Sequence, residues 1–427
     1  MDKKKLISAY ARFVPHRMLE LLGKNDITQV HLGVQVERKI TVLFADIRGF
    51  TAFSESLTPQ ENFNFINSFL SQMEPLISVN NGIVDKYIGD AIMAIFPQDA
   101  KDGVRCAQQM QRQLRIYNEG RSRAGYHPIR IGIGLNTGIA MIGTVGGYNR
   151  MDCTVISDAV NLASRIESMT KNYRVSCLIS ENTYNELSES CKKYTRFVDR
   201  TRVKGKLQSQ SIYEIFSEDP PKLQRQKLSR KRLFEEALAH YHQKQIDQCG
   251  VLLRRCLEKD EGDAPARIYL ERCAHFEQDG FHEGTFELSH NIQWSDAFSI
   301  NDEAIDAQHK QLVENCRRLV EFARDANRDT YIAHLHLTRK NTQAHFLYEE
   351  HLMTQTNYPF LPHQRTQHQF MLKEFSVLEK EAKSPKTSDT FLVFRTQIIL
   401  VDWLINHTLK EDKHLGRFLL ESREASE

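Results

Sequence analysis

The chain has 427 residues, enough at roughly 100 to 200 residues per domain for about two to four domains with sizeable cores. Its 57 Lys and Arg residues nearly balance its 55 Asp and Glu residues, which excludes a protein that binds nucleic acid through excess positive charge. The most apolar long segment, residues 391–405, contains Arg395 and Asp402, so we expect a buried helix and no membrane span. Because the N-terminus has no apolar signal segment and the eight cysteines form no CxxC pair, we expect a cytoplasmic protein with reduced thiols.

Apolar runs alternate with helical periodicity between residues 39 and 216, after an N-terminal segment (1–38) that we expect to be a short helical lead. The predicted elements are, in chain order, a strand at 39–47, a helix at 61–77, a strand hairpin at 83–96, a helix at 99–118, a strand at 129–138, a helix at 158–170, and strands at 175–180 and 210–216. Gly-rich hairpins within this alternation indicate a mixed sheet, and therefore an α+β domain over residues 39–216.

The second half of the chain is predicted to be helical. Residues 217–232 are a polar, proline-containing charge run, typical of a joint, and we expect a helical connector over 217–285. Within it, residues 233–277 resemble a single tetratricopeptide-like hairpin with an extra helix. One such unit cannot bury its own apolar face and so should pack on a neighbour or a partner chain. Residues 286–427 should form an antiparallel four-helix bundle, with helices at 303–323, 331–354, 363–381 and 388–421.

Two aspartates stand where strands end or turn. Asp46 closes the predicted strand 39–47, and Asp90 lies in the turn of the predicted hairpin 83–96. Two carboxylates beside a backbone carbonyl oxygen are hard ligands that suit Mg²⁺ or Mn²⁺. Either residue alone is also explained by local structure, Asp90 as a turn residue and Asp46 as a strand cap, so the metal site depends on the wider pattern.

Five motifs follow one another in the chain: FADIRGFT at 44–51, DKYIGDAIMAIF at 85–96, IGIGLNTG at 131–138, DCTVISDAVNLASRIE at 152–167 and VKGK at 203–206. In this order and spacing they resemble the catalytic domain of class III nucleotidyl cyclases. The resemblance implies a ferredoxin-like α+β fold that converts a nucleoside triphosphate to a 3',5'-cyclic nucleotide and diphosphate. The glycine run at 132–138 alone would be a weak match to a dinucleotide-binding loop, and its spacing argues against one.

The resemblance assigns metal ligands. It implies that Asp46, Asp90 and the backbone of Ile47 hold two Mg²⁺ or Mn²⁺ ions around the triphosphate of the substrate. One ion would lower the pKa of the ribose 3'-hydroxyl for attack on the α-phosphorus, and the other would neutralise the leaving diphosphate.

The resemblance also assigns residues that contact the substrate. Asn161 would orient the ribose, and Arg165, four residues later on the same helix face, would meet charge on the α-phosphoryl group. Lys204 would contact the terminal phosphates. Taken singly, Arg165 and Lys204 would be ordinary surface cations, and the motifs around them favour catalytic roles.

Base selection depends on Lys86 and Thr154. Adenine offers an acceptor at N1 and a donor at its 6-amino group, which Lys86 as a donor and the Thr154 hydroxyl as an acceptor would satisfy. Guanine reverses this pattern and would call for a carboxylate in place of Lys86, so ATP is the favoured substrate. Many members of the family have Asp where Thr154 stands, although Thr also occurs, and a guanylate cyclase is the alternative.

Because the family builds its active sites between two chains, we expect a head-to-tail homodimer with two shared sites. Asp46 and Asp90 of one chain would meet the residues of the other that bind base, ribose and phosphates: Lys86, Thr154, Asn161, Arg165 and Lys204.

Histidines gather near the C-terminus, where residues 282–427 hold 11 of the 17. Imidazole nitrogens together with carboxylate oxygens are a ligand set for non-haem iron. The segments WSDAFSINDEAIDAQHKQL, HFLYEEHLMTQTNYP, HQRTQHQF and WLINHTLKEDKHL resemble the hemerythrin family, which holds a carboxylate-bridged di-iron centre that binds O2 or changes redox state. The implied iron ligands are His309, His345, Glu349, His368, His407 and Asp412, with Glu349 and Asp412 as bridges.

One histidine of the hemerythrin pattern is replaced, because the position four before His368 is Gln364, with His363 beside it. Helix geometry places Gln364 ~40° from His368 around the axis and His363 ~140° away, so Gln364 faces the cluster more naturally. Three alternatives stay open: Gln364 is a weak oxygen ligand, water fills an open position, or distortion after Pro359 and Pro362 turns His363 inward. An altered or open iron would favour redox or ligand sensing over reversible O2 carriage.

These features together indicate an adenylate cyclase that is regulated by O2 or redox state at a di-iron bundle, through the helical connector. A silent nucleotide-binding domain beside an O2- or iron-binding bundle is the alternative. Retention of Asp46, Asp90, Asn161 and Arg165 argues against that silent domain.

Overall fold

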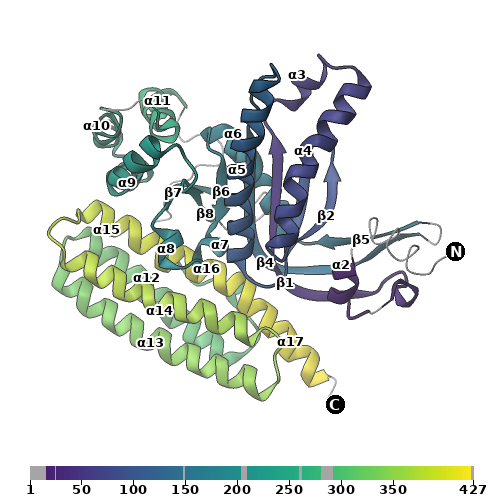
Figure 1. The fold of residues 1–427 in the computed structure, drawn as a ribbon. Coiled ribbons are helices and arrows are strands. Elements are labelled where there is room, and N and C mark those ends of the chain that lie inside the picture. The colour runs from purple at the N-terminus through teal and green to yellow at the C-terminus, as the bar shows by residue number, and fades with distance from the viewer. Residues whose placement is uncertain are drawn as a thin grey trace. The chain divides into compact units, whose positions relative to one another are not determined.

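A computed structural model of the protein describes residues 16–24, 26–147, 150–202, 209–258, 262–279 and 292–424. The chain divides into two compact units, which are drawn together in Figure 1. The first unit comprises Met1–Phe197 and Ile212–Ser229, and the second comprises Val198–Ser211 and Arg230–Glu427. Residues 198–211 therefore belong to the second unit, although residues of the first unit precede and follow them in the chain.

A mixed sheet forms the N-terminal fold, with strand order β2-β3-β1-β4-β6-β8-β7 and with β5 paired to β4. The strands are β1 (Gln35–Ile47), β2 (Ile83–Ile88), β3 (Ala91–Phe96), β4 (Ile131–Gly147), β5 (Arg150–Ile156), β6 (Cys177–Ser180), β7 (Thr195–Arg202) and β8 (Ser209–Ile215). β4 and β6 run parallel, whereas β1 is antiparallel to both of its neighbours. The predicted α+β fold with a mixed sheet is confirmed.

Helices cover both faces of this sheet. The helices of the N-terminal fold are α2 (His16–Leu21), the 3-10 helix η1 (Ile27–Gln29), α3 (Phe50–Ser54), α4 (Pro59–Val79), α5 (Ala100–Arg123), α6 (Asp158–Tyr173), α7 (Glu181–Asn185) and α8 (Glu189–Lys192). A Cβ at Gly103 of α5 would meet Leu135, and a Cβ at the adjacent Gly134 would meet the backbone of α6. Because neighbouring residues of a strand point to opposite faces, α5 and α6 lie on opposite sides of the sheet.

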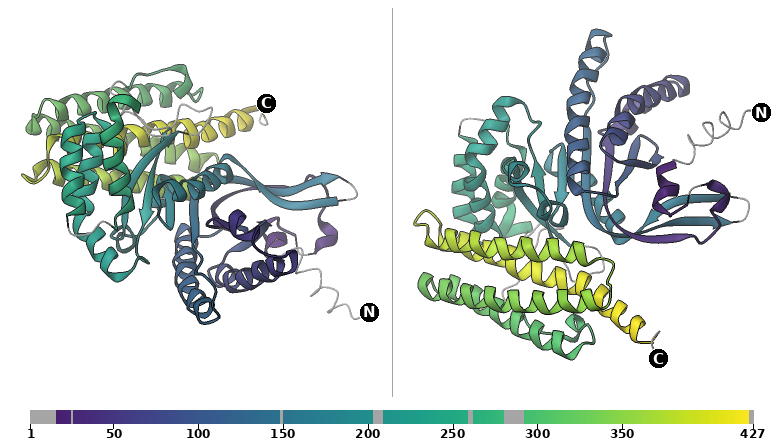
Figure 2. Two further views of the ribbon diagram at one scale, coloured as in Figure 1. Left: turned by 90° about the horizontal axis from the view of Figure 1, so that it is seen from above. Right: turned by 60° about the horizontal axis from the view of Figure 1, so that its bottom comes forward.

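The structure corrects the sequence-based prediction at several strands. β1 begins at Gln35, inside the segment expected to be a helical lead, and β4 continues to Gly147 and forms a long hairpin with β5 (Figure 2). β5 and β7 were not predicted. Their sequences, RMDCTVI and TRFVDRTR, contain several charged residues and lack the continuous apolar run that marked the other strands.

The second unit is helical. Its connector part contains α10 (Ile246–Leu257), α11 (Ala264–Asp279) and most of α9 (Pro221–His242). The bundle contains the 3-10 helix η2 (Asp296–Phe298), α12 (Glu303–Arg324), α13 (Arg328–Gln355) and α14 (Leu361–Lys383). Five consecutive helical segments then form one last rod over residues 389–424: α15 (Asp389–Thr396), η3 (Gln397–Asp402), α16 (Trp403–His407), η4 (Thr408–Asp412) and α17 (Lys413–Glu424). The rods run side by side in Figures 1 and 2, around an apolar core that includes Leu319, Leu335, Leu378 and Leu400.

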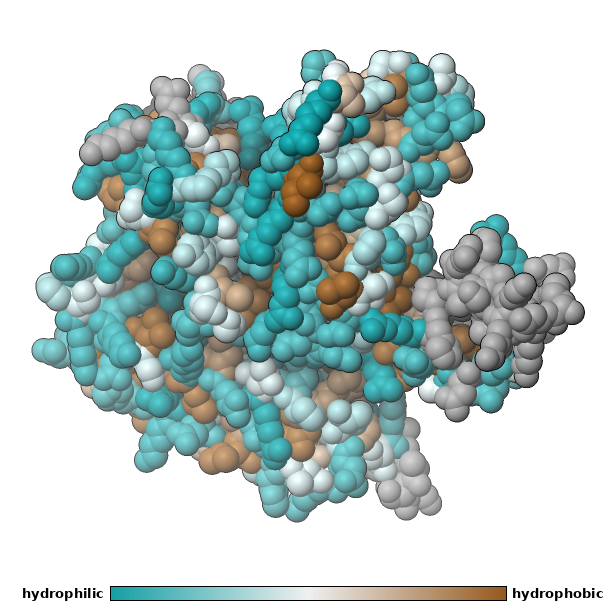
Figure 3. Space-filling view, in the orientation of Figure 1, coloured by the Kyte–Doolittle hydropathy of each residue, from teal (hydrophilic) through white to brown (hydrophobic). Residues whose placement is uncertain are grey.

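The last rod differs from the single α-helix expected over 388–421, because η3 and η4 are π-helical turns. Within the described part of the chain, no helix is both long enough and apolar enough to cross a membrane. On the face drawn in Figure 3, hydrophobic side chains form scattered patches among hydrophilic ones.

Candidate catalytic and metal sites

The paired aspartates meet at the end of β1 and in the turn between β2 and β3. In the register of β1 and β4, Asp46 stands opposite Gly132, on the face that α6 covers. Gly89 has a left-handed backbone with φ 64°, which suits the tight turn that presents Asp90. Burial, and next the negative charge of Asp46, raise the pKa of Asp90 to about 7. Two close carboxylates that resist ionising together fit a divalent cation between them.

Arg48 and Glu167 complete this cluster, and sequence analysis missed both. Nη1 of Arg48 lies 3.3 Å from Oε1 of Glu167. Burial raises the pKa of Glu167 to about 7, a rise that Arg48 opposes and that Asp46 and Asp90 support. A Cβ at Gly132 would lie 1.7 Å from Nη2 of Arg48, so the glycine leaves the space that the guanidinium occupies. The available sequence signal was the position of these residues inside the cyclase-like motifs.

Helix α6 carries the residues expected to contact the ribose and the α-phosphate. The hydroxyl of Ser157 caps the helix by accepting from the N–H of Val160. Asn161 is exposed and Arg165 is half-buried, and their spacing of four places both on one side of the helix. Lys204 lies outside the described residues.

Lys86 and Thr154 are direct neighbours in space, as base recognition by the two requires. Nζ of Lys86 donates to Oγ1 of Thr154 at 2.7 Å. Lys86 lies on β2, and Thr154 lies on β5, where it stands opposite Gly143 of β4. Thr154 is buried, while the Lys86 side chain exposes 43% of its surface. One chain therefore supplies both groups of the expected base-reading pair.

The six predicted iron ligands converge inside the bundle. They lie on α12 (His309), α13 (His345 and Glu349), α14 (His368), α16 (His407) and η4 (Asp412), and each is at most 4% exposed. Two groups have all ligand atoms within 4.8 Å of one another: His309, His345, Glu349 and Asp412, and Glu349, His368 and His407. Several of these buried nitrogen and oxygen atoms have no hydrogen-bond partner among the described residues. Two overlapping groups of imidazoles and carboxylates fit a centre with two iron ions.

Asp412 links histidines from two helices through a π-helical turn. Nε2 of His309 lies 3.3 Å from Oδ2 of Asp412, and Nε2 of His407 lies 3.2 Å from Oδ1. In an α-helix, five residues turn ~500°, which would leave Asp412 ~140° away from His407. The wider turn of η4 reduces this separation and allows both side chains to face the cluster. Burial lowers the pKa of His407 to about 4, which keeps its imidazole in the neutral form that binds metals.

Glu349 is the carboxylate shared by both groups. Its Oε2 lies 3.5 Å from Nε2 of His345 and 3.5 Å from Nε2 of His368. On the far side of each ring, Nδ1 of His345 lies 2.9 Å from Oε1 of Gln308, and Nδ1 of His368 lies 2.9 Å from Oε1 of Glu350. With Nδ1–H donating to these oxygens, both Nε2 atoms present lone pairs to the cluster. Sequence analysis missed Gln308 and Glu350, although both stand beside predicted ligands in the chain.

Gln364 is buried at the position where the hemerythrin pattern has a histidine, four residues before His368. It has no exposed surface, and neither of its amide atoms has a hydrogen-bond partner among the described residues. His363 is also buried, but its Nε2 lies 3.3 Å from Oε2 of Glu411. The structure thus gives His363 a carboxylate partner and leaves the Gln364 amide available.

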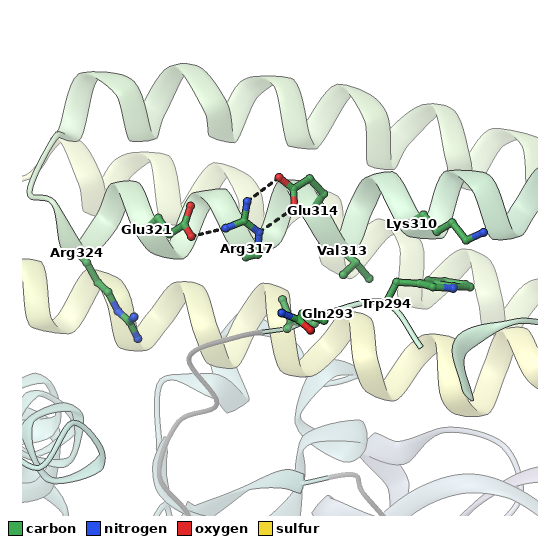
Figure 4. A pocket seen from close by; sticks show the side chains of 9 residues that line it. Gln293, Trp294, Lys310, Val313, Glu314, Arg317, Glu321 and Arg324 are labelled. Atoms are coloured by element: carbon green, nitrogen blue, oxygen red, sulfur yellow. Dashed lines mark hydrogen bonds and ion pairs between the residues drawn. The ribbon is translucent and has the colours of Figure 1, made fainter. Parts of the chain in front are cut away.

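A surface pocket of about 650 Å³ lies against α12, lined also by residues 292–294 (Figure 4). Arg317 forms ion pairs with Glu314 and Glu321 along its wall. The lining residues include none of the six predicted iron ligands. The pocket and the histidine cluster are therefore different sites.

Two parts of the chain match known families. Residues 32–216 match the family described as Adenylate and Guanylate cyclase catalytic domain, and residues 301–419 match the Hemerythrin HHE cation binding domain. An adenylate cyclase of Anabaena cylindrica is 41% identical over 218 residues, which cover 50% of this chain and 43% of the relative. The terminal-differentiation specific adenylate cyclase of Dictyostelium discoideum is 33% identical over 63% of this chain and 13% of its own length. The chain thus spans less than half the length of these curated relatives.

Solved structures match the N-terminal part. The guanylyl cyclase Cya2 is 31% identical, covers 44% of this chain and 95% of its own, and has a TM-score of 0.39. The adenylyl cyclase CyaB from P. aeruginosa is 32% identical, covers 42% of this chain and 95% of its own, and has a TM-score of 0.37.

The sheet topology, the facing aspartates and the family match together define the N-terminal part as a nucleotide cyclase catalytic domain. More particularly, the chain belongs to the class III cyclases through a catalytic domain at residues 32–216, joined to a hemerythrin HHE cation-binding domain at 301–419.

Proposed function

We propose that the protein is an adenylate cyclase that converts ATP to 3',5'-cyclic AMP and diphosphate. The hydrogen-bonded pair of Lys86 and Thr154 carries this proposal. Its ammonium can donate to adenine N1, and its hydroxyl oxygen can accept from the 6-amino group. With guanine, the ammonium would face the N1–H donor, which leaves both groups unsatisfied.

The reaction needs an in-line attack and neutralisation of charge. Asp46, Asp90 and the carbonyl of Ile47 would hold two Mg²⁺ or Mn²⁺ ions, which when bound supply positive charge to the triphosphate and acidify the ribose 3'-hydroxyl. Asn161 would fix the ribose so that O3' faces the α-phosphorus, and Arg165 would stabilise charge on the α-phosphoryl oxygens. The O3'–P bond forms, the bond to diphosphate breaks, and the hydroxyl proton leaves to solvent.

Product analysis with ATP and GTP tests the proposal. We expect cyclic AMP from ATP and a much lower rate with GTP. Asp46→Ala should abolish product from both substrates, and Lys86→Glu should shift the preference toward GTP. A preference of the unchanged protein for GTP would instead make it a guanylate cyclase.

We further propose that two copies share two active sites. The chain carries both the carboxylate cluster of Asp46 and Asp90 and the base-reading pair of Lys86 and Thr154. In a head-to-tail homodimer, each cluster would face the partner's base-reading pair, together with Lys204 of that partner.

We also propose that the bundle holds two iron ions and sets the cyclase rate according to O2 or redox state. Residues 198–211, which lead from β7 through Lys204, group with the C-terminal unit. The hydroxyl of Tyr269 on α11 donates to the carbonyl of Val198 at 3.0 Å, and Arg272 donates to Asp199 at 3.3 Å. Cyclase rates of the full chain, with iron oxidised and reduced, test this control. Equal rates would contradict it.

A further inference from the structure

Asp85 lies behind the pair of Lys86 and Thr154 and has no part in the reaction described above. Its side chain has no exposed surface. Oδ2 of Asp85 lies 3.2 Å from Oγ1 of Thr154 and 3.4 Å from Nζ of Lys86. Burial raises the pKa of the Asp85 carboxyl, and Lys86 and Thr154 oppose this rise. The carboxylate is therefore a buried partner of both base-reading groups.

A β-bulge explains how two consecutive residues reach the same partner. In a regular strand, neighbouring side chains point to opposite faces of the sheet. The pairing of β2 with β3 shifts between Val84 and Lys86, which leaves Asp85 as the extra residue. The bulge turns the side chains of Asp85 and Lys86 toward Thr154 together.

The hydrogen bonds among these three side chains have one direction. An ammonium has only protons to donate, and a carboxylate has only lone pairs to accept. The Thr154 hydroxyl therefore accepts from Lys86 and gives its single proton to Asp85. The hydroxyl oxygen can therefore only accept a hydrogen bond from a ligand, through its remaining lone pair.

We propose that Asp85 is a specificity-determining positioning residue, which commits the Thr154 proton and so makes this hydroxyl an acceptor for the 6-amino group of adenine. The inference rests on the proposed cyclase function. Guanine would direct its O6 acceptor at the same lone pair, and two facing acceptors are unfavourable. A Thr154 hydroxyl released from Asp85 could rotate and donate to O6, so discrimination against GTP would weaken.

Two substitutions in the full chain test whether Asp85 acts through its hydrogen bond with Thr154 or only through its negative charge beside Lys86. Asp85→Asn keeps an oxygen that can accept from Thr154, whereas Asp85→Ala removes the acceptor. We expect Asp85→Ala to lower the ratio of kcat/KM for ATP to that for GTP about tenfold, and Asp85→Asn to change it less than about threefold. Melting temperatures check folding, and a loss of folded protein lowers both rates without changing their ratio.

Each outcome is decisive. An unchanged ratio in Asp85→Ala would overturn the inference, and so would an equal fall in both variants, since the charge beside Lys86 would then be what matters. If the unchanged protein forms no cyclic nucleotide from ATP or GTP, the proposed cyclase function fails first. An ATP-specific protein with an unaltered Asp85→Ala ratio leaves that function intact and rejects only the role of Asp85.

A pair of cysteines in the connector carries a second, independent inference. Sγ of Cys249 on α10 lies 3.4 Å from Sγ of Cys273 on α11. Cys249 is buried, and Cys273 is half-buried. A disulfide bond is about 2.05 Å long, so the sulfur atoms would have to approach by about 1.4 Å. That movement is within reach of side-chain rotation and a small shift of two neighbouring helices.

The two thiols differ in acidity. The hydrogen bond between the two sulfur atoms, and then the positive charge of Arg254, lower the pKa of the Cys273 thiol. By contrast, the hydrogen bond with Cys273, and then burial, raise the pKa of the Cys249 thiol. Burial also raises the pKa of Cys106 and of Cys316 to about 12. Because the thiolate is the reactive form, Cys273 should be the more reactive thiol.

We infer that Cys249 and Cys273 are a redox site that hydrogen peroxide converts to a disulfide. The Cys273 thiolate attacks one peroxide oxygen, the O–O bond breaks, and hydroxide leaves, which gives a sulfenic acid. The Cys249 sulfur then attacks the sulfenic sulfur, and the departing oxygen leaves as water with the Cys249 proton. Two electrons pass from the thiols to one peroxide molecule. The new bond would fix α10 to α11, whose Arg272 binds Asp199 of β7.

Peroxide treatment of the full chain, followed by alkylation and peptide mass spectrometry, tests this site. We expect a peptide that joins Cys249 to Cys273, reversed by dithiothreitol and absent in Cys273→Ser. Cys316→Ser, a buried thiol in the bundle, is the matched control and should retain the cross-link. Over-oxidation of Cys273 without a cross-link, or a bond between Cys273 and Cys256, would overturn the inference.

Discussion

Arg200 and Asp402 form a buried ion pair that joins two segments far apart in the sequence. Nη2 of Arg200 lies 2.7 Å from Oδ1 and 2.6 Å from Oδ2 of Asp402, and the two side chains expose 3% and 5% of their surfaces. Arg200 lies on β7, four residues before Lys204, and Asp402 ends η3, directly before the helix of His407. The ion pair therefore connects the rod that carries His407 and Asp412 to β7, the strand that precedes Lys204 in the chain.

Asp402→Asn should weaken both stability and control. The change removes the negative charge of Asp402 from beside the buried Arg200 guanidinium, which should lower the free energy of unfolding of the C-terminal unit by about 3 to 5 kcal/mol. The ratio of cyclase rates with iron oxidised and reduced should move toward one, since the route to β7 is broken. Chemical denaturation and the paired rate measurements check the two effects.

A double variant separates control from stability. Arg200→Met with Asp402→Leu removes both charges and should recover the free energy of unfolding, while the cyclase stays insensitive to the iron state. Arg395→Met is the matched control, because Arg395 lies on the same rod and pairs with Glu374 and Glu381 inside the bundle. A double variant that keeps the full response would show that the ion pair is not the route.

Shared active sites predict recovery of activity on mixing. Asp46→Ala and Arg165→Ala chains should each be inactive alone. When equal amounts exchange subunits at random, half of the dimers contain one intact site of two, so activity should reach about a quarter of that of the unchanged protein. A mixture of Asp46→Ala with Asp90→Ala is the control and should stay inactive. No recovery in the first mixture would place each complete site within one chain.

Much of both candidate sites could be predicted because regular elements fix which side chains share a face. The spacing of His345 and Glu349 on one helix, and the position of Asp46 at a strand end, follow from the sequence. The structure then brings together ligands from separate helices, as the resemblance to known families implied.

The parts that escaped prediction depend on contacts between elements or on an irregular turn. Arg48 and Glu167 meet only because Gly132 leaves space between β4 and α6. The bulge at Asp85 and the π turn before Asp412 each add a residue to the regular repeat, so periodic patterns misplace the side chains that follow.

Removal of a bridging carboxylate should release iron. In Glu349→Ala the two groups of ligands lose their shared member, and we expect the iron content of purified protein to fall from about two ions per chain to fewer than one. Glu350→Gln is the matched neighbour, since Glu350 contacts the outer nitrogen of His368 and pairs with Arg365, and is in neither group of ligands. It should retain iron with an affinity about 10- to 100-fold weaker. Equal iron content in Glu349→Ala and the unchanged protein would contradict a bridging role.

The last prediction concerns the position that lacks a histidine. Because the Gln364 amide is buried and has no hydrogen-bond partner in the described part of the chain, Gln364→His should add an imidazole ligand, shift the absorption bands of the iron-loaded protein and slow its reaction with O2 or azide. His363→Gln is the control and should leave the spectrum unchanged, since His363 pairs with Glu411. If His363→Gln instead alters the spectrum and Gln364→Ala does not, His363 is the ligand, and the helix must be distorted after Pro362 when iron is bound.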